Sequence, residues 1–96
     1  MISELSVTLA HRVSRSDHVL SQDVGGEAVL LDLASEHYFG LNPVGTRIWQ
    51  LLETPTALSE LYRLLCSEFQ VDPMQIERDL LTLIGELSAA GLVVVE

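Results

Sequence analysis

Residues 29–52 read VLLDLASEHYFGLNPVGTRIWQLL, and this stretch decides the fold. Apolar side chains alternate along residues 27–33, which is typical of a half-buried strand. Residues 34–36 (Ala-Ser-Glu) form a short connection, and residues 37–41 predict the next strand. The two strands should therefore form a hairpin.

A helix follows this hairpin at once. Asn42 is a good N-cap, and Pro43 occupies the first helical position, where a missing N–H costs nothing. One apolar stripe then recurs at helical period, with Trp49 beside it. The predicted stripe consists of Val44, Ile48, Leu51 and Leu52.

Upstream, the hairpin extends into a meander. Residues 18–24 predict a strand, and Gly25-Gly26 is a turn signal between two extended runs. The result is a three-stranded antiparallel sheet. In the N-terminal segment, residues 1–16, apolar and polar side chains alternate between positions 7 and 13, which favours a short strand. Residues 14–17 suggest a break after it.

Downstream, two more helices are expected. Residues 54–56 end the first helix and cap the second, whose apolar stripe runs to Phe69. Asp72 begins a third helix as a capping box, with Gln75 placed to bond back to the Asp72 backbone. Gly91 ends that helix. Residues 93–95 either add a last strand or cover the sheet. We expect an α+β fold, winged helix-turn-helix-like, with residues 17–96 as a single domain.

Composition narrows the function classes. The 96 residues carry 14 acidic and 5 basic side chains, all five of them Arg, for a net charge of −9. Such a chain repels nucleic-acid phosphates and anionic membrane surfaces. A single cysteine excludes an internal disulfide. Neither a signal peptide nor a long apolar stretch is visible, so we expect a soluble, cytoplasmic protein.

Few residues suggest covalent or metal chemistry. Cys66 lies off the main apolar stripe of the second helix, and no His is near it in sequence. His11, His18 and His37 lack metal-ligand spacing, and no Gly-rich phosphate loop is present. We expect no metal, no cofactor and no catalytic residue.

The strand at residues 37–41 is the strongest binding candidate. It should lie at a sheet edge, where unpaired N–H and C=O groups can accept an added peptide strand. Gly40 permits close backbone approach. The third helix could supply apolar pockets beside it. The alternative is that Tyr38, Phe39 and Leu41 are ordinary core or rim residues and that the third helix is fully buried.

The order and spacing of these pieces resemble the PqqD-like family, whose members hold leader peptides of ribosomally made, modified natural products. The resemblance rests on residues 29–52, on the helix starts at residues 54–56 and at Asp72-Pro73, and on the ending at residues 87–93. It covers roughly three quarters of the chain. Within the family, residues 31–33, 38–42 and 48–52 look more like stand-alone lasso-peptide proteins.

The resemblance implies a non-enzymatic module and a site. The leader peptide would lie antiparallel to the third strand, between it and the third helix. A transglutaminase-like leader peptidase and an ATP-dependent cyclase would be partners, and the leader would carry a Tyr and a Pro three residues later. The implied contacts are Tyr38, Phe39, Gly40, Leu41, Ile76, Asp79, Leu80, Leu83, Ile84 and Leu87.

Several other functions stay open. A winged-helix regulatory or DNA-binding protein needs a basic recognition helix, yet the third helix offers Arg78 against Asp79 and Glu86. A PqqD-type partner of a radical-SAM enzyme is a second alternative. An acidic carrier protein would need Ser after Asp at a helix start, whereas Ser16-Asp17 has the reverse order. The last alternative is a small enzyme dependent on Cys66.

Overall fold

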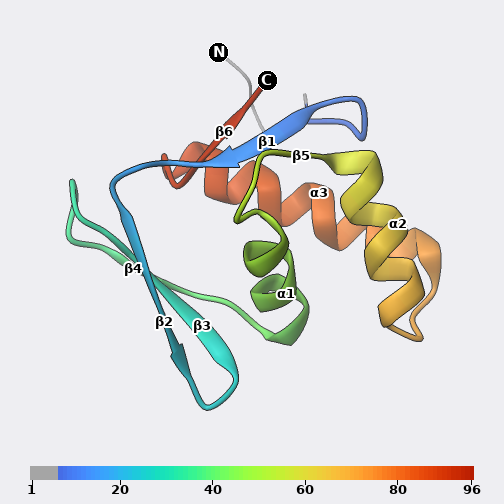
Figure 1. Cartoon of the computed structure of the whole chain (residues 1–96), viewed down its shortest axis with the longest axis horizontal. Coiled ribbons are helices and arrows are strands. Elements are labelled where there is room, and N and C mark those ends of the chain that lie inside the picture. Colours follow the sequence, from blue (N-terminus) through green and yellow to red (C-terminus); the bar gives the residue numbers. More distant parts are fainter. Residues whose placement is uncertain (1–6) are drawn as a thin grey trace.

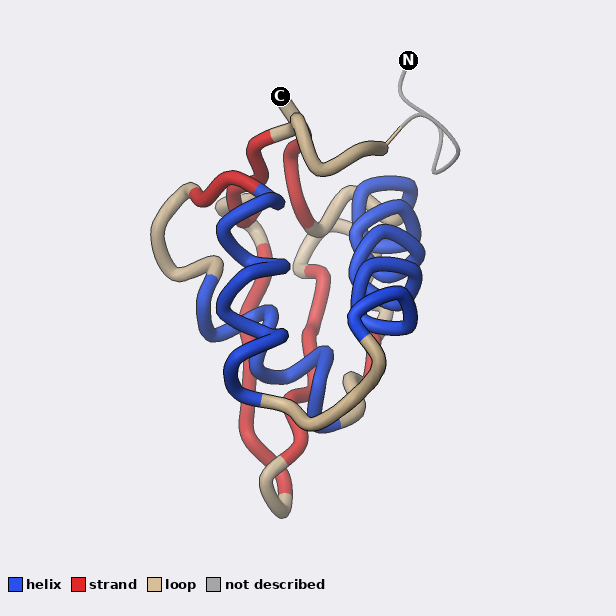
Figure 2. Tube along the Cα trace, turned by 90° about the vertical axis from the view of Figure 1, so that its right-hand side faces the viewer, coloured by secondary structure: helices blue, strands red, loops and turns tan. Residues whose placement is uncertain are grey.

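The described part of the chain contains two small antiparallel sheets and three helices (Figure 1), which is the α+β class that the sequence predicts. The computed structural model describes residues 7–96. The helices are α1 (Pro43–Leu51), α2 (Leu58–Glu68) and α3 (Pro73–Ala89). Viewed from the side of α2, α1 and α2 lie in front of the strands, and α3 lies beside them (Figure 2).

The predicted meander is present. Strands β2 (Val19–Val24), β3 (Glu27–Asp32) and β4 (Tyr38–Gly40) pair antiparallel in the order β2-β3-β4. Gly25 and Gly26 both have positive φ, 63° and 87°, as the turn between β2 and β3 requires. β4 therefore forms one edge of this sheet.

A second sheet joins segments that are distant in sequence. It has the order β5-β1-β6, with β1 (Arg12–Arg15) between β5 (Thr56–Ala57) and β6 (Val93–Val95). The strand expected between positions 7 and 13 thus lies later in the chain. Residues 14 and 15, expected as part of a break, belong to β1 because they pair with Val94 and Val93.

This sheet bears on the domain boundary. β1 lies within the N-terminal segment of residues 1–16, and it hydrogen-bonds to β6 near the C-terminus. The division into residues 1–16 and a domain of residues 17–96 stays a prediction. Residues 1–6 of that segment lie outside the described residues.

The helix starts follow the sequence signals. Asn42 Oδ1 accepts a hydrogen bond from Gly45 N at 2.8 Å, and Asp72 Oδ1 accepts one from Met74 N at 2.9 Å. Among the described residues, the Gln75 side chain accepts no hydrogen bond from Asp72 N, so the expected capping box is not closed; its amide nitrogen donates to Asp79 Oδ1 at 2.8 Å. Gly91, with φ of 78°, ends α3 as predicted.

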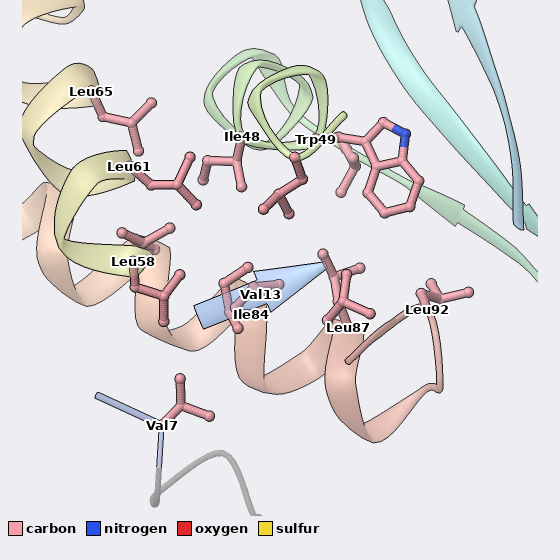
Figure 3. Packing of buried hydrophobic residues seen from close by; sticks show 14 of the residues in the cluster. Val7, Val13, Ile48, Trp49, Leu58, Leu61, Leu65, Ile84, Leu87 and Leu92 are labelled. Carbon is pink, nitrogen blue, oxygen red and sulfur yellow. The ribbon is translucent and has the colours of Figure 1, made fainter. Parts of the chain in front are cut away.

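The core lies where the three helices meet the sheets (Figure 3). Ile48 on α1, Leu61 on α2 and Ile84 on α3 are buried together with Val13 of β1. Trp49 and Leu92 belong to the same buried cluster, and the guanidinium of Arg15 stacks over the Trp49 ring at 4.6 Å from its centroid. None of the described helices is long and apolar enough to cross a membrane.

Thr46 joins the end of the meander to α1. The hydrogen-bond ladder between β3 and β4 ends at Leu41, whose N donates to Ala28 O at 2.9 Å. The Thr46 hydroxyl accepts from Ala28 N at 2.8 Å and donates to Leu41 O at 3.4 Å. Thr46 is only 4% exposed. Its hydroxyl therefore provides a hydrogen-bond partner for two buried backbone groups that do not bond to each other, the N–H of Ala28 and the C=O of Leu41.

Thr46→Val keeps the side-chain shape and removes this hydroxyl. We expect the free energy of unfolding in urea to fall by about 1–3 kcal/mol, the cost of stranding buried backbone groups. Thr46→Ser, the matched control, retains the hydroxyl and should lose less. A loss for Thr46→Val that is no larger than the loss for Thr46→Ser would contradict the assignment of the hydroxyl as the main contribution of Thr46 to stability.

Candidate functional site

The free edge of β4 is the first element of the site. Its ladder with β3 is bounded by bonds from Asp32 N to His37 O and from Leu41 N to Ala28 O, both 2.9 Å. Since successive residues of a strand alternate their bonding direction, Phe39 pairs inward with Leu30. The N–H and C=O groups of Tyr38 and Gly40 therefore point away from β3.

The side chains of β4 divide between two faces. Leu41 is buried and Phe39 half-buried, and both lie on the face that packs on the helices. Tyr38, on the opposite face, is 72% exposed. The strand is thus anchored through one face and through one edge, and no strand within residues 7–96 pairs with its other edge, which we call the open edge.

A groove runs beside this open edge, between β4, α1 and α3. Its volume is about 500 Å³. We call it the β4–α3 groove, and its lining combines apolar and charged side chains from three parts of the chain. The lining residues are Phe39, Gly40, Leu41, Asn42, Val44, Gly45, Ile48, Arg78, Asp79, Thr82, Leu83 and Glu86.

The polar groups of the groove come mainly from α3. Arg78, Asp79 and Glu86 are all exposed, so the wall carries two carboxylates and one guanidinium. Gln75 holds Asp79 through Oδ1, which leaves the other carboxylate oxygen free to meet a ligand. Hydrogen-bond donors and cations should be favoured along this wall.

Two glycines of the groove differ in their surroundings. A Cβ on Gly45 would lie 3.2 Å from Asn42 Oδ1 and 3.2 Å from Leu83 Cδ2, so glycine permits the close packing of α1 on α3. A Cβ on Gly40 would meet nothing within 4 Å. The protein itself therefore has room for a side chain at Gly40.

The structure brings together five of the ten residues that the resemblance implies. Phe39, Gly40, Leu41, Asp79 and Leu83 line the groove. Tyr38 lies next to it on the edge strand but outside its lining. The other four face the core and are 0–2% exposed: Ile76, Leu80, Ile84 and Leu87. Which of the ten contact a ligand stays a prediction.

Seven lining residues were missed from the sequence. On α3 they are Arg78, Thr82 and Glu86, which flank Leu83 at helical spacing on the face opposite the fully buried stripe. Their spacing of four residues places them on one helical face, and this spacing is the sequence signal that groups them. On α1 and its cap they are Asn42, Val44, Gly45 and Ile48. No local signal distinguishes Val44, Gly45 and Ile48 from ordinary core residues, or Asn42 from an ordinary helix cap.

The turn at residues 33–37 fixes where β4 begins. Asp32 accepts hydrogen bonds from Ala34 N at 3.0 Å and from the Ser35 hydroxyl at 2.8 Å, and His18 Nε2 lies 3.5 Å from its Oδ1. The hydrogen bond from Ser35, with smaller contributions from Ala34 and His18, lowers the pKa of the Asp32 carboxyl. Glu36 has φ of 62°, an uncommon conformation that this turn maintains.

The residues weighed for other chemistry lie elsewhere. Cys66 is half-buried on α2, and its hydrogen bond with Tyr62 raises the pKa of that phenol. His11 Nδ1 accepts a hydrogen bond from Thr8 N, and His18 pairs with Asp32. Among residues 7–96, no group of three or more His, Cys, Asp or Glu side chains could hold a metal ion.

The chain is similar to known proteins in both sequence and fold. The family model of coenzyme PQQ synthesis protein D (PqqD) matches residues 27–93. A solved structure of TbiB1 in complex with the TbiA(beta) leader peptide is 40% identical, with a TM-score of 0.76, and the match covers 83% of this chain and 93% of that chain. A solved lasso peptide synthetase B1 complexed with the leader peptide is 25% identical, with a TM-score of 0.69, covering 85% and 96%. No curated protein matches the chain significantly.

Asp32 makes stability dependent on pH. Because its pKa is lowered on folding, its contribution is complete above the ordinary value of 3.8 and is lost as the pH falls from there through the lowered pKa. Asp32→Asn should therefore be less stable than the unmodified protein near neutral pH, at about pH 7. That gap should narrow at about pH 2.5, in urea unfolding curves. Asp17→Asn changes an exposed carboxylate and, as the control, should have little effect on the free energy of unfolding. If the stability difference between Asp32→Asn and the unmodified protein were the same at both pH values, the assignment to the Asp32 carboxylate would be wrong.

Proposed function

We propose that this chain, which belongs to the PqqD family, binds the leader region of a ribosomally made precursor peptide as an added strand on β4. The observation that carries the proposal is the open backbone edge of Tyr38 and Gly40 beside the β4–α3 groove. An extended peptide satisfies those backbone groups directly and places alternate side chains toward α3.

The backbone contacts give this mode its affinity. A peptide that runs antiparallel to β4 can exchange hydrogen bonds with the N–H and C=O of Gly40 and of Tyr38. These bonds do not depend on the peptide sequence. Selectivity must therefore come from side chains that enter the groove.

The groove offers two kinds of side-chain contact. Val44, Ile48 and Leu83 form its apolar part, and Asp79, Thr82 and Glu86 contribute polar groups along the wall. The fully buried Leu80 and Ile84 lie beneath this wall and hold α3 in place. We therefore assign peptide contact on α3 to Asp79 and Leu83, together with Arg78, Thr82 and Glu86.

We further propose that the pathway makes a lasso peptide and that the chain has no catalytic activity of its own. Both solved structures cited above are complexes with leader peptides, and one is called a lasso peptide synthetase B1. The chain would present its bound precursor to a separate leader peptidase and to an ATP-dependent cyclase. The alternative is a role as the partner of a radical-SAM enzyme, in a pathway of the PqqD type.

Gly40→Pro tests strand addition directly. Proline removes the outward N–H of Gly40 without removing a bond to β3, and edge positions tolerate proline. The probe is a labelled leader peptide encoded beside the gene, and its binding is measured by fluorescence polarisation. We expect its dissociation constant to rise at least about tenfold, because roughly one well-placed hydrogen bond and its neighbour are lost. Gly40→Ala is the matched control, since it keeps the N–H and has room for its methyl group.

Both variants must keep the circular dichroism spectrum of the unmodified protein. Leader binding that survives Gly40→Pro undiminished would exclude strand addition at β4. Failure of the unmodified protein to bind any short peptide encoded nearby would exclude the leader-binding function itself.

Delivery makes a separate prediction. If the chain acts only by raising the local concentration of precursor at the peptidase, its variants should alter the apparent KM for precursor. We expect Gly40→Pro to slow leader removal at low precursor concentration and to be rescued at high concentration. Cys66→Ala, a control away from the groove, should retain full activity. A Gly40→Pro defect that persists at saturating precursor would contradict a purely recruiting role.

A further inference from the structure

An open notch lies on the outer face of the meander, the face of β2, β3 and β4 that is turned away from the helices. Its volume is about 370 Å³, and its lining includes Val24, Glu27, Val29, Gly40 and Asn42. We propose that this notch, named here the Gly40 notch, holds the side chain of one Lys or Arg of the bound peptide, with the charged end beside Glu27. The proposal rests on the proposed function and names a class of peptide residue for it.

The missing side chain of Gly40 creates this notch. Gly40 pairs with Val29 across the ladder between β3 and β4. Both lie on the outer face, because the neighbours of Val29 along β3, Ala28 and Leu30, are buried on the opposite face. A Cβ on Gly40 would meet nothing within 4 Å among the described residues. The space over Gly40 is therefore available to a side chain from another molecule.

Strand addition places one peptide side chain over Gly40. In an antiparallel pair, residues directly opposite each other have their side chains on the same face. The peptide residue opposite Gly40 therefore points to the outer face, while its two neighbours face the β4–α3 groove. Gly40 lines both the groove and the notch, so one bound strand meets both. The peptide residue in the notch lies an odd number of positions from every groove-facing residue.

The lining of the Gly40 notch matches a long cationic side chain. Val24, which is 59% exposed, and Val29 supply apolar surface. Glu27 is exposed and forms no salt bridge with any residue of the described chain, and no Arg or His lines the notch. A residue on β3 is two strand spacings, about 10 Å, from the peptide backbone, so the occupant must be long. Lys and Arg lay their methylene stems on apolar surface and keep the charge in water.

The charge of the whole chain must be separated from this local contact. A net charge of −9 attracts any basic peptide, wherever its basic residues lie. Long-range attraction depends on the total charge, whereas the Gly40 notch requires one particular carboxylate. Two variants that change the net charge equally at different places distinguish the two effects.

Glu27→Gln removes the carboxylate of the notch and keeps the shape of the side chain. Glu77→Gln is the matched control, because it makes the same change in net charge at an exposed position of α3 that lines neither the groove nor the notch. The probe is the fluorescein-labelled leader peptide encoded beside the gene, together with versions in which each Lys or Arg is replaced singly by Gln. Thermal unfolding midpoints confirm that both protein variants fold.

We expect Glu27→Gln to raise the dissociation constant about threefold at low ionic strength, the value of one exposed ion pair, and Glu77→Gln to change it much less. Replacing one basic residue of the peptide should cause the same loss. That replacement should have no further effect on Glu27→Gln, because both changes remove one contact. The loss should shrink in about 0.5 M NaCl, where charges are screened over a few ångströms.

The two proposals fail differently. Equal effects of Glu27→Gln and Glu77→Gln, or losses that add between Glu27→Gln and every basic residue of the peptide, overturn the Gly40 notch. A sensitive basic residue at even spacing from the apolar positions that an alanine scan of the peptide identifies also overturns it, as does a leader with no sensitive basic residue. In each of these cases, binding that is weakened by Gly40→Pro leaves leader recognition intact. Binding that ignores Gly40→Pro overturns the proposed function itself.

Discussion

A strand has hydrogen-bonding groups along two edges, and β4 satisfies those of one edge only. Its three residues are too few to stand alone, so pairing with β3 and burial of Leu41 and Phe39 must hold it. Everything else about the site follows from this asymmetry. The face toward the helices is fixed by packing, while the outward edge remains available to another chain.

The helices convert this open edge into a groove. Only Leu41 and Asn42 separate β4 from α1, so α1 begins next to the open edge. Where the hydrogen bonds between β3 and β4 end, the Thr46 hydroxyl bonds to the backbone groups of Ala28 and Leu41. α3 comes from much later in the chain and forms the opposite wall. Gly45, which lies against Leu83, sets how closely these two helices approach.

The sequence predicts the local parts of this arrangement well and the distant parts poorly. The turn at Gly25-Gly26, the Asn42 cap and the end of α3 at Gly91 depend on nearby residues, and the structure confirms them. The second sheet depends on β1 pairing with β6, about eighty residues away, for which short apolar runs give no signal. On α3, periodicity identifies an apolar stripe but not which edge of it is covered. Leu80 and Leu83 read alike in sequence, yet only Leu83 reaches the groove.

The contact between Gly45 and Leu83 has a consequence for the time course of recognition. Because α1 and α3 pack closely there, with Leu83 Cδ2 3.2 Å from where a Cβ of residue 45 would lie, the groove has its width without a ligand. A site formed in advance loses little conformational entropy on association. Encounter rates should then be similar for good and poor peptides, and discrimination among them should lie in how long each one stays bound.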